Sequence, residues 1–76
     1  MVYTITFDAN KMDEYQRGLV SGVMYMATGM PEKTHSWARS HDKTLWFKDL
    51  ECTEEQLIGI GKIVGKLLPG AILSVS

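Results

Sequence analysis

Residues 35–48, His-Ser-Trp-Ala-Arg-Ser-His-Asp-Lys-Thr-Leu-Trp-Phe-Lys, decide the fold because they combine two strand-like segments with a turn between them. If His41 and Asp42 form a two-residue loop, Trp37 lies opposite Trp46 in the resulting hairpin. Because side chains alternate across a strand, one face then holds small and apolar residues, namely Ser36, Ala38, Leu45 and Phe47. The other face holds a mainly aromatic and basic set, namely His35, Trp37, Arg39, Thr44, Trp46 and Lys48. We predict that the first face joins the core and that the second is exposed.

The segment before the hairpin has the pattern of a strand followed by a helix. Residues 2–7 alternate in strand fashion, which predicts that Tyr3, Ile5 and Phe7 face the core. Apolar side chains recur at helical spacing over residues 11–28, with expected core positions at Met12, Tyr15, Leu19, Val23 and Met26. Asn10 is the expected N-cap and Gly29 the expected C-cap. Three further apolar residues make the apolar arc of this helix wider than a single contact with the sheet requires, namely Val20, Met24 and Tyr25. These side chains could form a partner surface or cover the gap between two helices.

The hairpin strands are expected at residues 33–40 and 43–49, and a second helix and a last strand follow them. Thr53 with Gln56 has the form of a capping box, which predicts a helix over residues 54–67. The expected core positions of this helix are Leu57, Ile60, Val64 and either Leu67 or Leu68. Pro69-Gly70 ends the helix, and residues 71–75 form the last strand.

The resulting β-α-β-β-α-β order predicts a single α+β domain over residues 1–76, a ferredoxin-like split β-α-β sandwich. Two helices would cover one face of a four-stranded antiparallel sheet, with the first and third strands at its centre. The bare face is then expected to hold Val2, Thr4, Thr6, Lys33, His35, Trp37, Arg39, Trp46, Lys48, Ile72 and Ser74.

Composition narrows the class of protein. The formal net charge of −1 argues against a protein that coats nucleic acid. The only cysteine, Cys52, has no intramolecular disulfide partner, which fits a reducing compartment. The N-terminal residues lack a basic leader, and no stretch approaches the ~20 apolar residues that span a bilayer. We therefore expect a soluble cytoplasmic protein without a membrane partner.

Signatures of catalysis or cofactor binding are missing from the sequence. Cys52 has acidic neighbours that oppose a thiolate and no histidine base beside it. His35 and His41 lack the spacing of metal ligands. Glycines instead repeat at helical spacing, which predicts a close backbone approach between the two helices at Gly18, Gly22, Gly61 and Gly65. We expect no enzyme activity, no metal and no cofactor.

The element order is similar to that of RNA-recognition motifs, which stack bases on aromatic residues of their central strands. Trp46 falls on a central strand, but Thr4 and Thr6 stand where that family has its other aromatic residue. Small acylphosphate hydrolases share the topology as well, and Asp8-Ala9-Asn10 lacks the arginine of their phosphate loop. Both resemblances are confined to topology and imply no function for this chain.

The aromatic and basic face leads to a functional hypothesis. We expect a small binding protein of the inhibitor or adaptor type, a class that includes viral proteins directed against host factors. The expected contact residues are Lys33, His35, Trp37, Arg39, Trp46 and Lys48, and the expected partner is a protein. Binding of single-stranded nucleic acid by the same face is the alternative. A homodimer that buries this face is the second alternative.

Overall fold

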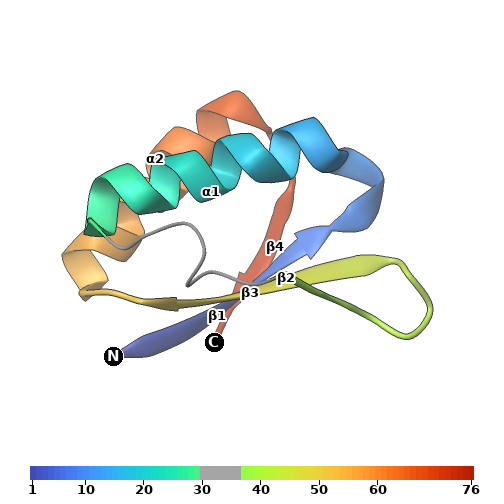
Figure 1. Ribbon diagram of the computed structural model, residues 1–76, viewed down its shortest axis with the longest axis horizontal. Coiled ribbons are helices and arrows are strands. Elements are labelled where there is room, and N and C mark those ends of the chain that lie inside the picture. Colours follow the sequence, from blue (N-terminus) through green and yellow to red (C-terminus); the bar gives the residue numbers. More distant parts are fainter. Residues whose placement is uncertain (30–36) are drawn as a thin grey trace.

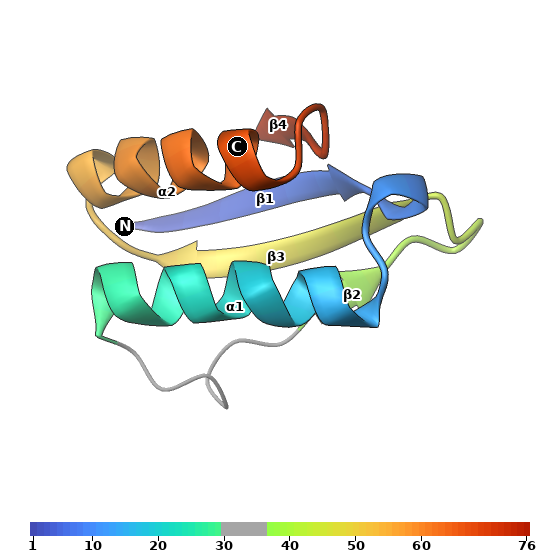
Figure 2. The same ribbon diagram turned by 90° about the horizontal axis from the view of Figure 1, so that it is seen from above.

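The computed structural model describes residues 1–29 and 37–76. Its elements are β1 (Val2–Asp8), the 3-10 helix η1 (Ala9–Lys11), α1 (Glu14–Thr28), β2 (Trp37–Arg39), β3 (Leu45–Glu51), α2 (Glu54–Leu67) and β4 (Ile72–Val75). The strands form one antiparallel sheet in the order β2-β3-β1-β4. Both helices lie on the same side of this sheet (Figure 1). Seen from above, α1 runs beside β3 and β2, whereas α2 runs beside β1 and β4 (Figure 2). The predicted ferredoxin-like architecture, with β1 and β3 at its centre, is confirmed.

Local capping signals set the ends of the helices. Thr53 and Gln56 form the predicted capping box, and α2 covers the predicted residues. Gly29 ends α1 with a φ of 72°, as predicted for its C-cap. The predicted N-cap of α1 at Asn10 is wrong, because Asp13 caps this helix in a second capping box with Gln16. Asp8 accepts a hydrogen bond from the Asn10 N–H instead, and this contact starts the 3-10 turn.

Helix α1 buries a different stripe from the predicted one. Val20 and Met24 are its buried apolar residues. The predicted core residues Tyr15, Leu19 and Met26 are exposed instead. Both stripes have helical spacing and lie on the order of 140° apart around the helix, so periodicity alone did not distinguish them. In α2, Ile60 and Val64 are buried and Leu68 packs on the core, whereas Leu67 is 51% exposed.

The hairpin loop is longer than predicted and shifts the register by two residues. Trp37 lies opposite Lys48, and Arg39 lies opposite Trp46. The Ser40 N–H donates to the Leu45 carbonyl, which leaves residues 41–44 as the loop. The Asp42 carboxylate holds the loop closed, since it accepts hydrogen bonds from the Ser40 hydroxyl and from the N–H and hydroxyl of Thr44.

The aromatic and basic face of the hairpin points toward the helices, and its predicted exposure is wrong. A shift of two residues keeps its members on one face because side chains alternate with a period of two. The pairing of β3 with β1 decides the direction, since Trp46 lies opposite Phe7 and Lys48 lies opposite Ile5. Phe7 and Ile5 are buried beneath the helices, so their partners on β3 point to the same side. Ile72 lies opposite Phe7 and packs on the core as well.

The bare face of the sheet mixes polar, acidic and apolar residues in the part of the chain that the structure describes. It holds Val2, Thr4, Thr6 and Ser74, as predicted, and in addition Ala38, Phe47, Asp49 and Glu51. The Thr4 hydroxyl donates a 2.7 Å hydrogen bond to the Asp49 carboxylate across this face. The predicted aromatic platform is therefore absent from it.

Candidate binding surface

The two tryptophans lie side by side, as their sequence positions suggested, but they take part in the core. The Trp37 ring centroid is 5.3 Å from that of Phe7 and 6.3 Å from that of Trp46, the latter in edge-to-face geometry. Both indoles are half-buried. The Trp37 Nε1 donates a 3.0 Å hydrogen bond to the Oγ of Ser21, a buried residue of α1. These contacts attach the hairpin to α1.

Cationic side chains surround the same indoles. The guanidinium carbons of Arg17 and Arg39 lie 4.1 and 4.9 Å from the Trp46 ring centroid. Lys48 is 0% exposed, and its Nζ lies 5.3 Å from the Trp37 ring centroid. All three distances are within the ~6 Å range of a cation–π contact. The indole of Trp46 is thus already engaged by guanidinium groups of its own chain.

The remaining predicted contact residues, Lys33 and His35, lie outside the described residues, together with the expected start of the second strand at residues 33–36. Arg39 is exposed and donates a 3.2 Å hydrogen bond to the Lys43 carbonyl at the base of the loop. Of the six predicted contact residues, the structure therefore brings together Trp37, Arg39, Trp46 and Lys48.

Three further observations bear on chemistry. Burial raises the pKa of the Cys52 thiol, so this side chain stays protonated at neutral pH. No three His, Cys, Asp or Glu side chains within residues 1–29 and 37–76 cluster as metal ligands would. Neither α1 nor α2, the two α-helices of these ranges, is long and apolar enough to cross a bilayer.

The outer side of α1 carries the apolar stripe that was expected in the core. We call it the outer face and define it by Tyr15, Gly18, Leu19, Gly22, Val23 and Met26, which together with Glu14 line a shallow hollow. Met26 is 85% exposed and Tyr15 is 74% exposed. The hollow continues toward α2 through Ala27 and Ile63. An exposed apolar area of this kind, on a helix that already buries another stripe, is typical of an interface.

The glycines of this face make no close contact within the described chain. A Cβ built on Gly18 or Gly22 would meet no atom within 4 Å, and the same holds for Gly61 and Gly65 of α2. The predicted backbone approach between the helices is therefore wrong. Each glycine lowers helix stability by about 1 kcal/mol relative to alanine, and no contact of these glycines with residues 1–29 or 37–76 offsets that loss.

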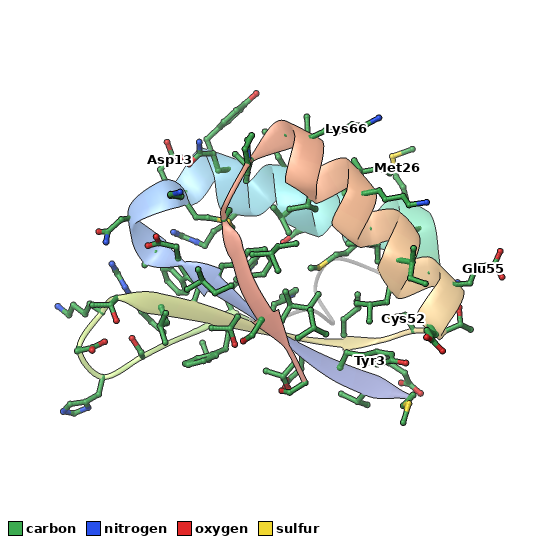
Figure 3. The ribbon with its side chains drawn as sticks, turned by 180° about the vertical axis from the view of Figure 1, so that it is seen from behind. Tyr3, Asp13, Met26, Cys52, Glu55 and Lys66 are labelled. Atoms are coloured by element: carbon green, nitrogen blue, oxygen red, sulfur yellow. The ribbon has the colours of Figure 1, made fainter. Side chains whose placement is uncertain are left out.

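Basic residues border the outer face on the side of α2. Lys62 and Lys66 are exposed and lie one position before and three positions after Ile63. Figure 3 shows Met26 and Lys66 projecting from the outer surface of the helix layer, away from the sheet. Cys52, in contrast, lies where β3 meets α2. The outer surface of the helix layer thus combines apolar side chains with positive charge on α2 and with the acidic Glu14 at the start of α1.

Sequence reasoning missed this surface although its signal was present. The arc of α1 that includes Val20, Met24 and Tyr25 was recognised as too wide for one contact, with a partner surface as one explanation. The bulky side chains of Tyr15, Leu19 and Met26 favoured their assignment to the core. The buried and the exposed stripe of α1 are therefore the reverse of those predicted. No family model, curated protein or solved structure matches this chain.

Proposed function

We propose that the protein is a small non-enzymatic binding protein of the inhibitor or adaptor type, whose outer face holds another protein. The observation that carries this proposal is the exposure of Tyr15 and Met26 beside the hollow at Gly18 and Gly22. Tyrosine and methionine are enriched at protein interfaces, and methionine adapts its shape to a partner. The proposed binding surface thus lies on the helix layer, whereas the sequence pattern pointed to the sheet.

Energetics favour a protein partner for this face. Burying a large apolar side chain contributes about 1.5–3 kcal/mol, so Tyr15, Leu19 and Met26 together offer several kcal/mol on association. A partner backbone or side chain can approach closely at the two glycines. The partner that fits best is an amphipathic helix whose apolar ridge lies in the hollow and whose acidic residues meet Lys62 and Lys66. A cytoplasmic location belongs to the same proposal and is supported by the free thiol of Cys52.

Nucleic acid fits the described surfaces less well. The bare sheet face carries Asp49 and Glu51, whose charge repels phosphate. Trp46 already has guanidinium groups over its ring, which compete with a stacking base. A second copy of the chain is the remaining alternative occupant of the outer face, and the experiment separates all three.

The experiment compares three forms of the tagged full chain in the lysate of the cells that express it. The first is the wild type, and the second is Tyr15→Ser/Met26→Ser. The third is Val2→Ser/Ile58→Ser, a matched control that removes two exposed apolar side chains outside the outer face. We expect the wild type and the control to retain the same protein at constant stoichiometry and the Tyr15/Met26 variant to lose it. With purified partner, calorimetry should give a negative heat-capacity change of binding.

Other outcomes overturn the proposal in distinguishable ways. Equal capture by all three forms would remove the outer face from the interaction. Capture abolished by nuclease would replace the protein partner with nucleic acid. A wild-type dimer that light scattering shows to be monomeric only in the Tyr15/Met26 variant would assign the face to a second copy.

A further inference from the structure

A separate apolar cavity lies between α2 and the half of the sheet formed by β1 and β4. Its volume is about 300 Å³, and β1, α2 and β4 all contribute to its wall, among them Ile5, Phe7, Ile60, Leu68, Ile72 and Val75. The other lining residues are Leu57 and glycines. This volume is at the lower end of the ~300–1,000 Å³ of small-molecule pockets. The wall contains no side chain that would hold water by hydrogen bonds.

Two glycines of α2 keep this cavity open. Gly61 and Gly65 are part of its wall, and a Cβ on either would meet no atom within 4 Å. Protein interiors are normally packed to the density of organic crystals, so a larger residue at these positions would be expected to fill the space. Alanine would also favour the helix at each position. The chain thus has glycine where both packing and helix propensity favour a side chain.

A positively charged side chain, Lys11, lies next to the cavity wall at Gly70 without being part of the wall. Gly70 belongs to the wall, and the Lys11 Nζ lies 2.7 Å from the position that a Gly70 Cβ would occupy. Lys11 is an exposed residue, which favours the approach of an anion from solvent to this part of the molecule. A cation next to an apolar cavity matches a ligand with an apolar body and an anionic end.

We propose that this cavity binds a single unbranched hydrocarbon chain that ends in a carboxylate, a medium-chain fatty acid. The chain lies under α2 against Ile5 and Ile60, and the carboxylate meets the Lys11 ammonium group beside Gly70. One water molecule occupies roughly 30 Å³ in the liquid, and a methylene group is of similar size. The cavity therefore accommodates on the order of ten non-hydrogen atoms of a ligand. The site shares no lining residue with the outer face and does not depend on the proposed protein partner.

The test titrates the ¹⁵N-labelled protein with decanoate and with decanol, below the concentration at which either aggregates. Decanoate should shift the amide signals of Gly61, Gly65 and Gly70 in a saturable way. Decanol should shift the same signals with roughly tenfold lower affinity, because it lacks the charge-assisted contact. Lys11→Gln should lower decanoate affinity by a similar factor and leave decanol affinity unchanged.

Filling the cavity provides the second arm. Gly61→Leu should lower the affinity for both ligands by at least roughly tenfold, because its side chain occupies the space of several methylene groups. If that variant fails to fold, Gly61→Ala/Gly65→Ala serves instead, with a severalfold loss expected. Gly22→Ala is the matched control, since it makes the same change on α1 away from the cavity. Absence of saturable shifts in the wild type, shifts confined to Gly18 and Gly22, or unchanged affinity in the filled variants would each overturn the assignment.

Discussion

The indole N–H of Trp37 on edge strand β2 donates a hydrogen bond to the Ser21 hydroxyl on α1, with a distance of 3.0 Å between Nε1 and Oγ. Ser21 is buried, so its hydroxyl depends on this contact in place of water. β2 covers only Trp37–Arg39 and pairs with a single neighbour, β3. This bond is therefore one of the links that hold the outer edge of the sheet against the helix layer.

Removing this hydrogen bond should destabilise the protein. Trp37→Phe keeps an aromatic ring but leaves Ser21 without the indole donor, and we expect a loss of about 1–3 kcal/mol in the free energy of unfolding. In a double-mutant cycle with Ser21→Ala, urea denaturation should give a coupling energy of about 1 kcal/mol. A cycle of Trp37→Phe with Ser74→Ala on distant β4 is the control and should be additive. Additivity in both cycles would contradict the bond.

Arg17 should stabilise the fold through Trp46. Its guanidinium carbon lies 4.1 Å from the indole centroid, so Arg17→Ala should cost about 0.5–1 kcal/mol by urea denaturation and alter the tryptophan emission. Arg17→Lys should retain only part of the stability that Arg17→Ala loses, since an ammonium group lacks the planar stacking surface of a guanidinium group. Lys62→Ala is the control, because Lys62 is an exposed residue of α2, and it should change stability by less than about 0.5 kcal/mol. Equal effects of Arg17→Ala and Lys62→Ala would sink the prediction.

Glycine positions should respond in opposite directions to alanine. Gly22→Ala should raise the free energy of unfolding by about 0.5–1 kcal/mol, because the added methyl group meets nothing within 4 Å and favours the helix. Gly29→Ala should lower it by about 1 kcal/mol, since its φ of 72° disfavours a residue with a Cβ. Thermal unfolding of both variants measures the difference. A loss of stability in Gly22→Ala would show that its surroundings are closer than described.

Local sequence signals predicted the elements well because capping is decided within a few residues. The side chains of Thr53 and Gln56 each accept a hydrogen bond from the backbone N–H of the other residue. The start of α2 could therefore be predicted without knowledge of the rest of the chain. The end of α1 at Gly29 was predictable in the same way, because a glycine C-cap is also a local signal. At the start of α1, Asn10 was the expected cap, but Asp8 caps the 3-10 turn and Asp13 caps the helix. Such a choice depends on the exact path from β1 into the helix.

The orientation of the hairpin was not predictable in the same way, because it is set by a strand far away in the sequence. Trp46, Lys48 and Leu50 alternate on β3, and the pairing of this strand with β1 turns all three toward the helices. Leu50 is buried beneath the helices, so it points to the core side of the sheet. Lys48, which lies between Trp46 and Leu50 on the same face, instead favoured a prediction that this face is exposed. The loop length depended on a network of side-chain hydrogen bonds among Ser40, Asp42 and Thr44. Turn propensity reflects the contact of the Asp42 carboxylate with the Thr44 N–H, but not the combination of all three side chains. The predicted exposure of the aromatic and basic face is therefore wrong, whereas the role of its residues in binding stays a prediction.

The hairpin loop should respond to acid through Asp42. Hydrogen bonds from the hydroxyls of Thr44 and Ser40 and from the Thr44 N–H lower the pKa of Asp42 from its ordinary 3.8 to about 2. Because these groups stabilise the ionised form, Asp42 contributes stability that is fully present above its ordinary pKa. That contribution falls as the pH drops through the folded-state pKa. The loop should therefore keep its structure down to about pH 4 and loosen between about pH 4 and pH 2.

Two local NMR signals measure this transition without interference from other carboxyl groups. The ¹³C shift of the Asp42 carboxyl should titrate with a midpoint near pH 2, and the Thr44 amide, which donates to it, should follow the same curve. Asp42→Asn removes the titrating group, so the Thr44 amide of that variant should lack this step. A midpoint at the ordinary value of 3.8 in the wild type would mean that the hydroxyls do not hold the carboxylate. The four-residue loop, and with it the register that pairs Arg39 with Trp46, would then need revision.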